Sequence, residues 1–119
     1  MDLEEIRRSY RPDSVSVLFV GESPPSGGTF FYCGNSRLFT HTVVAFRDAF
    51  GLRPSDPKRF LSLFKHAGCY LDDLSLTPLN HLDDSHRRKA RRRAMIGFRQ
   101  RVESVHPQAV VCVKELWHS

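Results

Sequence analysis

The sequence predicts a single α/β domain, built on a parallel sheet of three strands flanked by helices. Short apolar runs at 15–20, 69–74 and 109–113 are rich in β-branched and aromatic residues, as buried strands are. The longer segments between them repeat apolar residues at helical spacing. Strands that alternate with helices are joined by right-handed crossovers, which place the strands parallel in one sheet.

The first strand, 15–20, is nearly all apolar and ends at Gly21. A loop follows at 21–36, and it contains four glycines, two prolines and three aromatic residues. Loops of this length in small domains are usually functional or disordered. The next segment, 37–50, carries apolar residues on one helical face, and Gly51 supplies the stop of this helix.

A second helix is expected from Asp56, a capping residue followed by Pro57 in the first turn, to Gly68. The second strand, 69–74, comes directly after it. A third helix is expected over 85–105 because small and apolar residues recur there on one face. These residues are Ala90, Ala94, Phe98, Val102 and Val105.

Composition limits the class of protein. The 119 residues fit one domain, 1–119, and 40% hydrophobic with 26% charged residues is typical of a globular chain. No run approaches the ~20 apolar residues of a membrane span, and the charged N-terminus lacks a signal core. Three cysteines without Cys-x-x-Cys spacing predict no disulfide framework, no metal site and a reducing, cytoplasmic setting. Two of them stand in apolar runs and are expected to be buried: Cys69 and Cys112.

A stiff loop with one carboxylate follows the first strand. It reads Gly21-Glu22-Ser23-Pro24-Pro25, and its two prolines restrict the backbone. Open α/β sheets bind ligands at the carboxyl ends of their strands, which is where Glu22 stands. Glu22 is therefore either a carboxylate placed for chemistry or a cap or ion-pair partner on an ordinary turn.

Three consecutive aromatic residues stand at 30–32 in the same loop. Three neighbouring rings cannot easily all face a core, so one or two are expected to form a stacking surface for a base, worth ~1–3 kcal/mol per base. The alternative is that Phe30 or Phe31 fills the core beneath the loop. We expect one ring in each role.

The third predicted helix carries unbalanced positive charge. Eight of the fifteen residues 87–101 are Arg or Lys, and no acidic residue stands between Asp84 and Glu103. Like charges four residues apart destabilise a helix, so the run favours a polyanionic partner over an ordinary solvated face. With the apolar face on the sheet, these charges are expected to project outward and bind nucleic-acid phosphates. The candidate phosphate-binding residues are Arg87, Arg88, Lys89, Arg91, Arg92 and Arg93.

Polar residues also follow the second strand, first Asp72 and Asp73 and then the segment 77–81. If the first two strands are neighbours, these groups lie beside Glu22 and could hydrogen-bond a ligand. The alternative is a capped turn that leads into the next helix.

Three features follow one another along the chain: the segment VLFVGESPPSGGTFFY, an aromatic-rich helix, and the segment GCYLDDLSLTPLN. Together they resemble the uracil-DNA glycosylase superfamily, nearest the branches whose first motif reads Gly-Glu-x-Pro. The resemblance covers about residues 15–114. It implies a parallel four-stranded sheet flanked by helices, and an enzyme that flips a base out of DNA and hydrolyses its bond to the sugar. No cofactor is expected, since the iron–sulfur branches need four cysteines.

The resemblance also implies roles for residues of the first loop. Glu22 matches the acidic residue that positions water and stabilises the cationic sugar. Gly21 and Ser23 match backbone positions that line the base pocket. Phe30 or Phe31 matches the ring that stacks on the flipped base.

Two departures from the family pattern bear on function. Asp73 falls where many members place an Asn that reads uracil, but an ionised Asp only accepts hydrogen bonds and O4 of uracil needs a donor. The sequence also stops before any counterpart of the fourth strand and its His-Pro type motif. The run Ala109–Val113 would then be an exposed apolar edge, so we expect marginal stability, self-association or pairing with a separate C-terminal piece.

Three functions from different classes are compatible with these features. The first is a DNA glycosylase-like domain, and the second is a non-catalytic nucleic-acid-binding remnant of the same fold. The third is a nucleotide- or phosphate-binding α/β protein unrelated to repair. DNA is the expected partner under the first two, and no membrane partner is expected.

Overall fold

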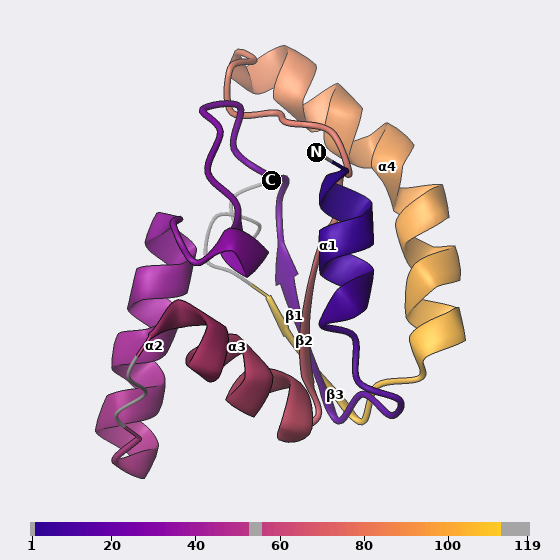
Figure 1. Cartoon of the computed structure of the whole chain (residues 1–119). Coiled ribbons are helices and arrows are strands. Elements are labelled where there is room, and N and C mark those ends of the chain that lie inside the picture. The colour runs from indigo at the N-terminus through magenta and orange to yellow at the C-terminus, as the bar shows by residue number, and fades with distance from the viewer. Residues whose placement is uncertain (1, 53–55, 113–119) are drawn as a thin grey trace.

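The structure, a computed structural model, describes residues 2–52 and 56–112. Three parallel strands form one sheet in the order β2-β1-β3, which confirms the predicted α/β class. In Figure 1, α2 and α3 lie on one side of the strands, α4 lies on the other, and α1 runs beside β2. In chain order the elements are α1 (Leu3–Ser9), β1 (Val17–Gly21), the 3-10 turn η1 (Phe31–Cys33), α2 (Arg37–Phe50), α3 (Pro57–His66), β2 (Cys69–Asp73), α4 (Asp84–Val105) and β3 (Ala109–Cys112).

The carboxyl ends of β1 and β2 lie side by side. Gly21 pairs with Asp73 in the register of the two strands. Beyond the strands, Leu74 N–H donates to the Gly21 carbonyl and Ser75 N–H donates to the Glu22 carbonyl, both at 2.9 Å. The loop after β2 therefore lies beside the loop that carries Glu22, as the sequence predicts.

An aromatic core fills the space between the sheet and the pair α2 and α3. The ring of Phe64 lies within 6 Å of four other phenylalanine rings, those of Phe19, Phe31, Phe46 and Phe60. Interlocked rings of this kind hold their neighbours in fixed positions. The loop after β1 is consequently anchored to a rigid layer through its own aromatic residues.

The sequence reasoning did not identify α1. Asp2 caps this helix, and its side chain accepts the Glu4 and Glu5 backbone N–H groups. Partly buried apolar residues at 3, 6 and 10 pack against the main core. The helix is only 7 residues long, too short to form alone, so its order depends on this packing.

Side chains close the outer edge of β2. The Tyr32 hydroxyl accepts the Leu71 N–H at 2.6 Å and donates to the Leu71 carbonyl at 2.9 Å. Arg7 Nη1 donates to the same carbonyl, and Arg101 Nη2 donates to the Asp73 carbonyl. These groups occupy backbone positions that another strand would otherwise pair with, so this edge is blocked.

We expect Tyr32→Phe to lower the free energy of unfolding by about 1–3 kcal/mol, because the buried N–H and C=O of Leu71 both lose a partner. Urea unfolding measures the loss, and faster exchange of the Leu71 amide locates it. Tyr70→Phe is the matched control, since the Tyr70 hydroxyl is not hydrogen-bonded to any described residue. Equal losses in the two variants would contradict a specific role for the Tyr32 hydroxyl.

The opposite edge of the sheet is exposed. In the described part of the chain β3 pairs only with β1, and Val110 and Val111 are 49% and 45% exposed on its two sides. This matches the expected apolar edge at 109–113, although residue 113 lies outside the described residues. The expectation that Cys112 is buried is wrong, because this strand is uncovered; Cys69 is buried as expected. Over the described ranges, no helix combines the length and the apolar character that crossing a bilayer requires.

Candidate nucleic-acid interface

A cavity of about 130 Å³ lies at the carboxyl ends of β1 and β2. It is smaller than the ~300–1,000 Å³ of ordinary ligand pockets, which suits one small ring better than a whole nucleotide. The loop after β1, the first turn of α2 and the end of β2 supply its walls. Four of the residues predicted to form a base pocket line this cavity: Ser23, Phe30, Phe31 and Asp73.

The two aromatic residues of the cavity are fixed by core packing. Phe30 and Phe31 are only 2% and 4% exposed, so both rings belong to the core rather than one to each expected role. Phe31 meets the ring of Tyr32 edge-on, with centroids 5.0 Å apart. The Phe30 N–H donates to Asn35 Oδ1 at 2.8 Å. A ligand would therefore contact these rings inside the cavity and not on an open surface.

The segment 77–81 supports the loop after β1. Ser23 Oγ accepts the Leu79 N–H at 3.1 Å, and Asn80 Oδ1 accepts the Ser26 N–H at 3.0 Å. These bonds join the two loops at the carboxyl end of the sheet. Polar groups that were expected to serve a ligand thus hold the cavity wall in place.

Gly21 does not line the cavity itself. Because it has no side chain, it leaves room for the carboxylate of Asp73, which does line the cavity. A Cβ at this position would lie 2.5 Å from Oδ1 of Asp73. Only glycine leaves the space that this oxygen occupies. The predicted role of Gly21 is therefore indirect in the structure.

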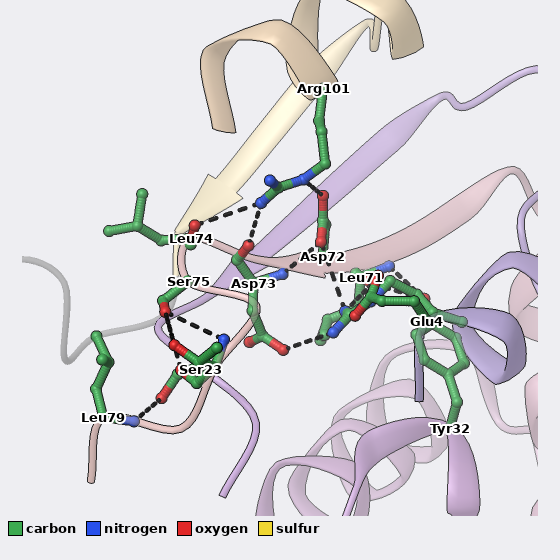
Figure 2. Close-up of polar contacts among 12 residues, drawn as sticks. Glu4, Ser23, Tyr32, Leu71, Asp72, Asp73, Leu74, Ser75, Leu79 and Arg101 are labelled. Atoms are coloured by element: carbon green, nitrogen blue, oxygen red, sulfur yellow. Dashed lines mark hydrogen bonds and ion pairs between the residues drawn. The ribbon is translucent and has the colours of Figure 1, made fainter. Parts of the chain in front are cut away.

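Asp73 is a buried carboxylate on the cavity wall, with 7% of its side chain exposed. Its Oδ2 accepts a hydrogen bond from Arg7 Nη2 at 3.1 Å. Burial raises the pKa of Asp73 to about 6, although the Arg7 charge and hydrogen bond oppose the shift. Figure 2 shows Asp73 beside Asp72, whose carboxylate accepts from Arg101 Nε.

Arg7 is the first of two residues of this site that the sequence did not predict. Its side chain is almost fully buried, and it donates to Glu4, the Leu71 carbonyl and Asp73. Its guanidinium lies over the Phe30 ring, 5.1 Å from the centroid. Burial lowers the pKa of Arg7, but the charges of Asp73, Asp72 and Glu4 outweigh burial and raise it. Through Arg7, helix α1 thus contacts two residues that line the cavity, Phe30 and Asp73.

Helical spacing was the available signal for Arg7. Leu3, Ile6, Arg7 and Tyr10 stand at i, i+3, i+4 and i+7, which places the arginine on the apolar face. Asp2 followed by Glu5 three residues later resembles a capping box. An arginine on an apolar stripe indicates a buried carboxylate partner, because unpaired buried charge is costly.

Arg37 is a second residue that the prediction left out. It is exposed, it lines the cavity, and it stands at the first position of α2 after the cap Ser36. A cation at a helix N-terminus adds to the positive potential that the helix itself provides there. The mouth of the cavity is therefore suited to an anionic group of the ligand.

Glu22 lies next to the cavity but faces α4. Both of its carboxylate oxygens accept from Arg87 Nε at 2.9 Å, and Arg91 Nη1 also donates to one of them. Burial raises the pKa of Glu22, but the hydrogen bonds from Arg87 and Arg91 outweigh it and lower the pKa. The carboxylate is thus ionised and tightly held. Of the two interpretations that the sequence left open, this conformation corresponds to the ion pair.

The positive charges of α4 divide into two sets. Arg87, Arg91 and Arg101 share the half-buried face with the predicted apolar stripe, and each binds a carboxylate. For these three the expectation of outward projection is wrong, because their spacing puts them on the face that packs against the sheet. The outward set is exposed and forms no ion pair with any described residue. It consists of Arg88, Lys89, Arg92, Arg93 and Arg99.

A second cavity, of about 250 Å³, lies where α4 passes the end of β2. Arg88, Arg91 and Arg92 line it together with Leu74 and Met95. Arg91 Nε is buried and has no hydrogen-bond partner among the described residues. An anion at this position would meet three guanidinium groups beside an apolar wall.

Comparison with protein-family models, with curated proteins and with solved structures gives no match to this chain.

Proposed function

We propose that this chain is a nucleic-acid-binding domain of the DNA glycosylase type. It would hold a flipped base in the 130 Å³ cavity and hydrolyse the bond between that base and its sugar. One observation carries the proposal: Ser23, Phe30, Phe31 and Asp73 line one cavity where two neighbouring parallel strands end, beside Glu22. This is the end of a sheet at which α/β proteins bind ligands, and a flipped base needs both rings and polar groups around it.

The ionised state of Glu22 fits one part of the chemistry. Cleavage of a glycosidic bond passes through a cationic, oxocarbenium-like sugar, which a nearby carboxylate stabilises. Water adds to the sugar carbon, its proton passes to solvent or to the carboxylate, and the base leaves with the bonding electrons. Arg87 and Arg91 weaken the negative field of Glu22, so full catalytic strength would require phosphates to draw these arginines away.

A second candidate function is a binding domain without turnover. The pairing of Glu22 with two arginines favours it, because the carboxylate is already neutralised. Base release from single- and double-stranded oligonucleotides that contain uracil, hypoxanthine or xanthine distinguishes the two functions. Release indicates a glycosylase. Binding to the same oligonucleotides without release indicates the binding domain, and absence of both contradicts the proposal.

The exposed basic face of α4 predicts binding that depends on salt. We expect Arg92→Ala and Arg93→Ala each to lower the slope of log affinity against log salt by about 1, with similar losses for all sequences. Fluorescence anisotropy at several salt concentrations measures the slope. Arg47→Ala on α2 is the control, since Arg47 is exposed on the other side of the sheet. An unchanged slope in both α4 variants would argue against phosphate binding there.

We also propose that the exposed strand β3 mediates association with a second copy of the chain. Val111→Lys is expected to reduce self-association in sedimentation velocity, because a charge on an edge strand opposes further pairing. Val44→Lys is the control, since Val44 is 37% exposed but stands on helix α2 and not on a strand. A wild-type protein that remains monomeric at high concentration and melts at high temperature contradicts this proposal.

A further inference from the structure

We propose that the 130 Å³ cavity selects a single-ring base that carries an exocyclic amine, the cytosine type of edge, and disfavours the carbonyl edge of uracil. The inference rests on the proposed function, because it assumes that the cavity takes a base. It deepens that function by naming the class of base. Asp73 is the residue that would set the preference.

The geometry of Asp73 leaves one hydrogen-bond acceptor unused. Oδ2 is bonded to Arg7, whereas Oδ1 accepts no hydrogen bond from any residue that the structure describes. In Figure 2 the second oxygen of the Asp73 carboxylate has no dashed line. The side chain is 93% buried on the cavity wall. Among the described residues, the only fully buried side-chain atom without a hydrogen-bond partner is Arg91 Nε, so Oδ1 of Asp73 keeps some exposed surface through which a ligand can reach it. A ligand N–H that replaces water at this oxygen would satisfy it.

The protein fixes the orientation of this carboxylate from several sides. Arg7 holds one oxygen, and Gly21 leaves room for the other. The Asp73 N–H donates to Asp72 Oδ1 at 2.8 Å, which restrains the backbone beneath it. The acceptor is therefore pre-positioned and cannot readily turn away from a ligand.

Burial, Asp72 and Glu4 raise the pKa of Asp73, whereas Arg7 favours its ionised, hydrogen-bond-accepting form. Arg7 and Glu4 face it from α1, Asp72 adjoins it on β2, Arg101 approaches from α4, and Arg37 lies across the cavity. Because burial raises the pKa of Asp73 only to about 6, the group is mostly ionised at pH 7.5. An ionised carboxylate accepts hydrogen bonds and donates none.

The two pyrimidine edges respond differently to such a group. The N4 amine of cytosine donates to Asp or Glu, whereas uracil presents its O4 acceptor at the equivalent place. Two acceptors that face each other in a buried site leave both unsatisfied. Purines also carry amines, but the small cavity volume favours a single ring.

The test uses short strands that are abasic at every position except the centre, where they carry cytosine, uracil, 2-pyrimidinone or no base. Fluorescence anisotropy at pH 7.5 gives the affinity of the whole chain for each strand. We expect cytosine to bind on the order of tenfold tighter than uracil. The 2-pyrimidinone strand should lose that advantage, since it is cytosine without the amine, and this comparison needs no change to the protein.

A protein variant provides the complementary measurement. Asp73→Asn is expected to remove the preference and to strengthen uracil binding, because an amide both donates and accepts. Asp48→Asn, at an exposed position of α2, is the control. Uracil binding as tightly as cytosine, with both tighter than the fully abasic strand, overturns the inference and leaves the base pocket standing. Strands with a base that bind no better than the abasic strand overturn the pocket itself, and with it the proposed function.

Discussion

Replacing Arg7 with methionine is expected to lower the free energy of unfolding by about 3–5 kcal/mol, the usual effect of removing one partner from a buried ion pair. Arg7 is 1% exposed and its guanidinium serves Glu4, Asp73 and the Leu71 carbonyl together. Methionine fills a similar volume and is flexible, so the loss of charge and hydrogen bonds dominates. Urea unfolding followed by circular dichroism measures the change.

Two controls separate this effect from a general weakening of α1. Arg8→Met alters an exposed arginine on the same helix, and we expect a change within about 0.5 kcal/mol. Arg7→Lys keeps the charge but not the planar fork of donors, so its loss should be intermediate. A loss for Arg7→Met no larger than that for Arg8→Met would mean that the Asp73 carboxylate does not depend on Arg7.

The loss should also depend on pH. Asp73 has its folded-state pKa raised from 3.8 to about 6, so it contributes stability below about pH 4 and loses that contribution as the pH rises toward 6. Without Arg7, its pKa rises further, and ionisation above pH 6 becomes more costly. The deficit of Arg7→Met should thus be smaller at pH 5 than at pH 8. Adding Asp73→Asn to the variant should recover part of the loss, because no charge is then left unpaired.

The elements that the sequence predicted well share a strong local signal. Continuous apolar runs marked β1 and β2, and helical spacing with capping residues marked α2, α3 and α4. The position of the Glu22 loop beside the loop that follows β2 could be predicted from one topological rule, that neighbouring parallel strands end at the same side of a sheet. These features depend on residues close together in sequence or on the order of the strands.

The parts that escaped prediction depend on contacts between distant residues. Arg7 meets Asp73 across 66 positions, and Arg87 meets Glu22 across 65. The residues next to each of these side chains in the sequence do not indicate a distant partner, so each would be predicted to be an exposed charge. Helical spacing alone places Arg87 and Arg91 on the same face of α4 as the apolar stripe. Because most of the neighbouring residues are also Arg or Lys, these two could not be distinguished from the exposed charges.

Replacing Glu22 with glutamine is expected to lower base release by about 10²–10³-fold, the usual effect of removing one group that stabilises transition-state charge. The change keeps the shape of the side chain and removes its negative charge. Release from labelled oligonucleotides under single-turnover conditions measures the step directly. Circular dichroism melting checks that the variant is folded, since Arg87 and Arg91 both lose a charged partner.

Binding should change in the opposite direction. Without the Glu22 carboxylate, Arg87 and Arg91 are no longer neutralised, so α4 offers more positive charge to phosphates. We therefore expect Glu22→Gln to bind DNA as tightly as the wild-type protein or more tightly, with a steeper salt dependence. Glu103→Gln is the matched control, because it makes the same change of net charge at an exposed position on the same helix. Loss of base release with retained binding in Glu22→Gln would identify Glu22 as catalytic. Release that persists in this variant would show that Glu22 takes no part in the mechanism. If the wild-type protein binds DNA without base release, the ion pairs of Glu22 with Arg87 and Arg91 are structural contacts only.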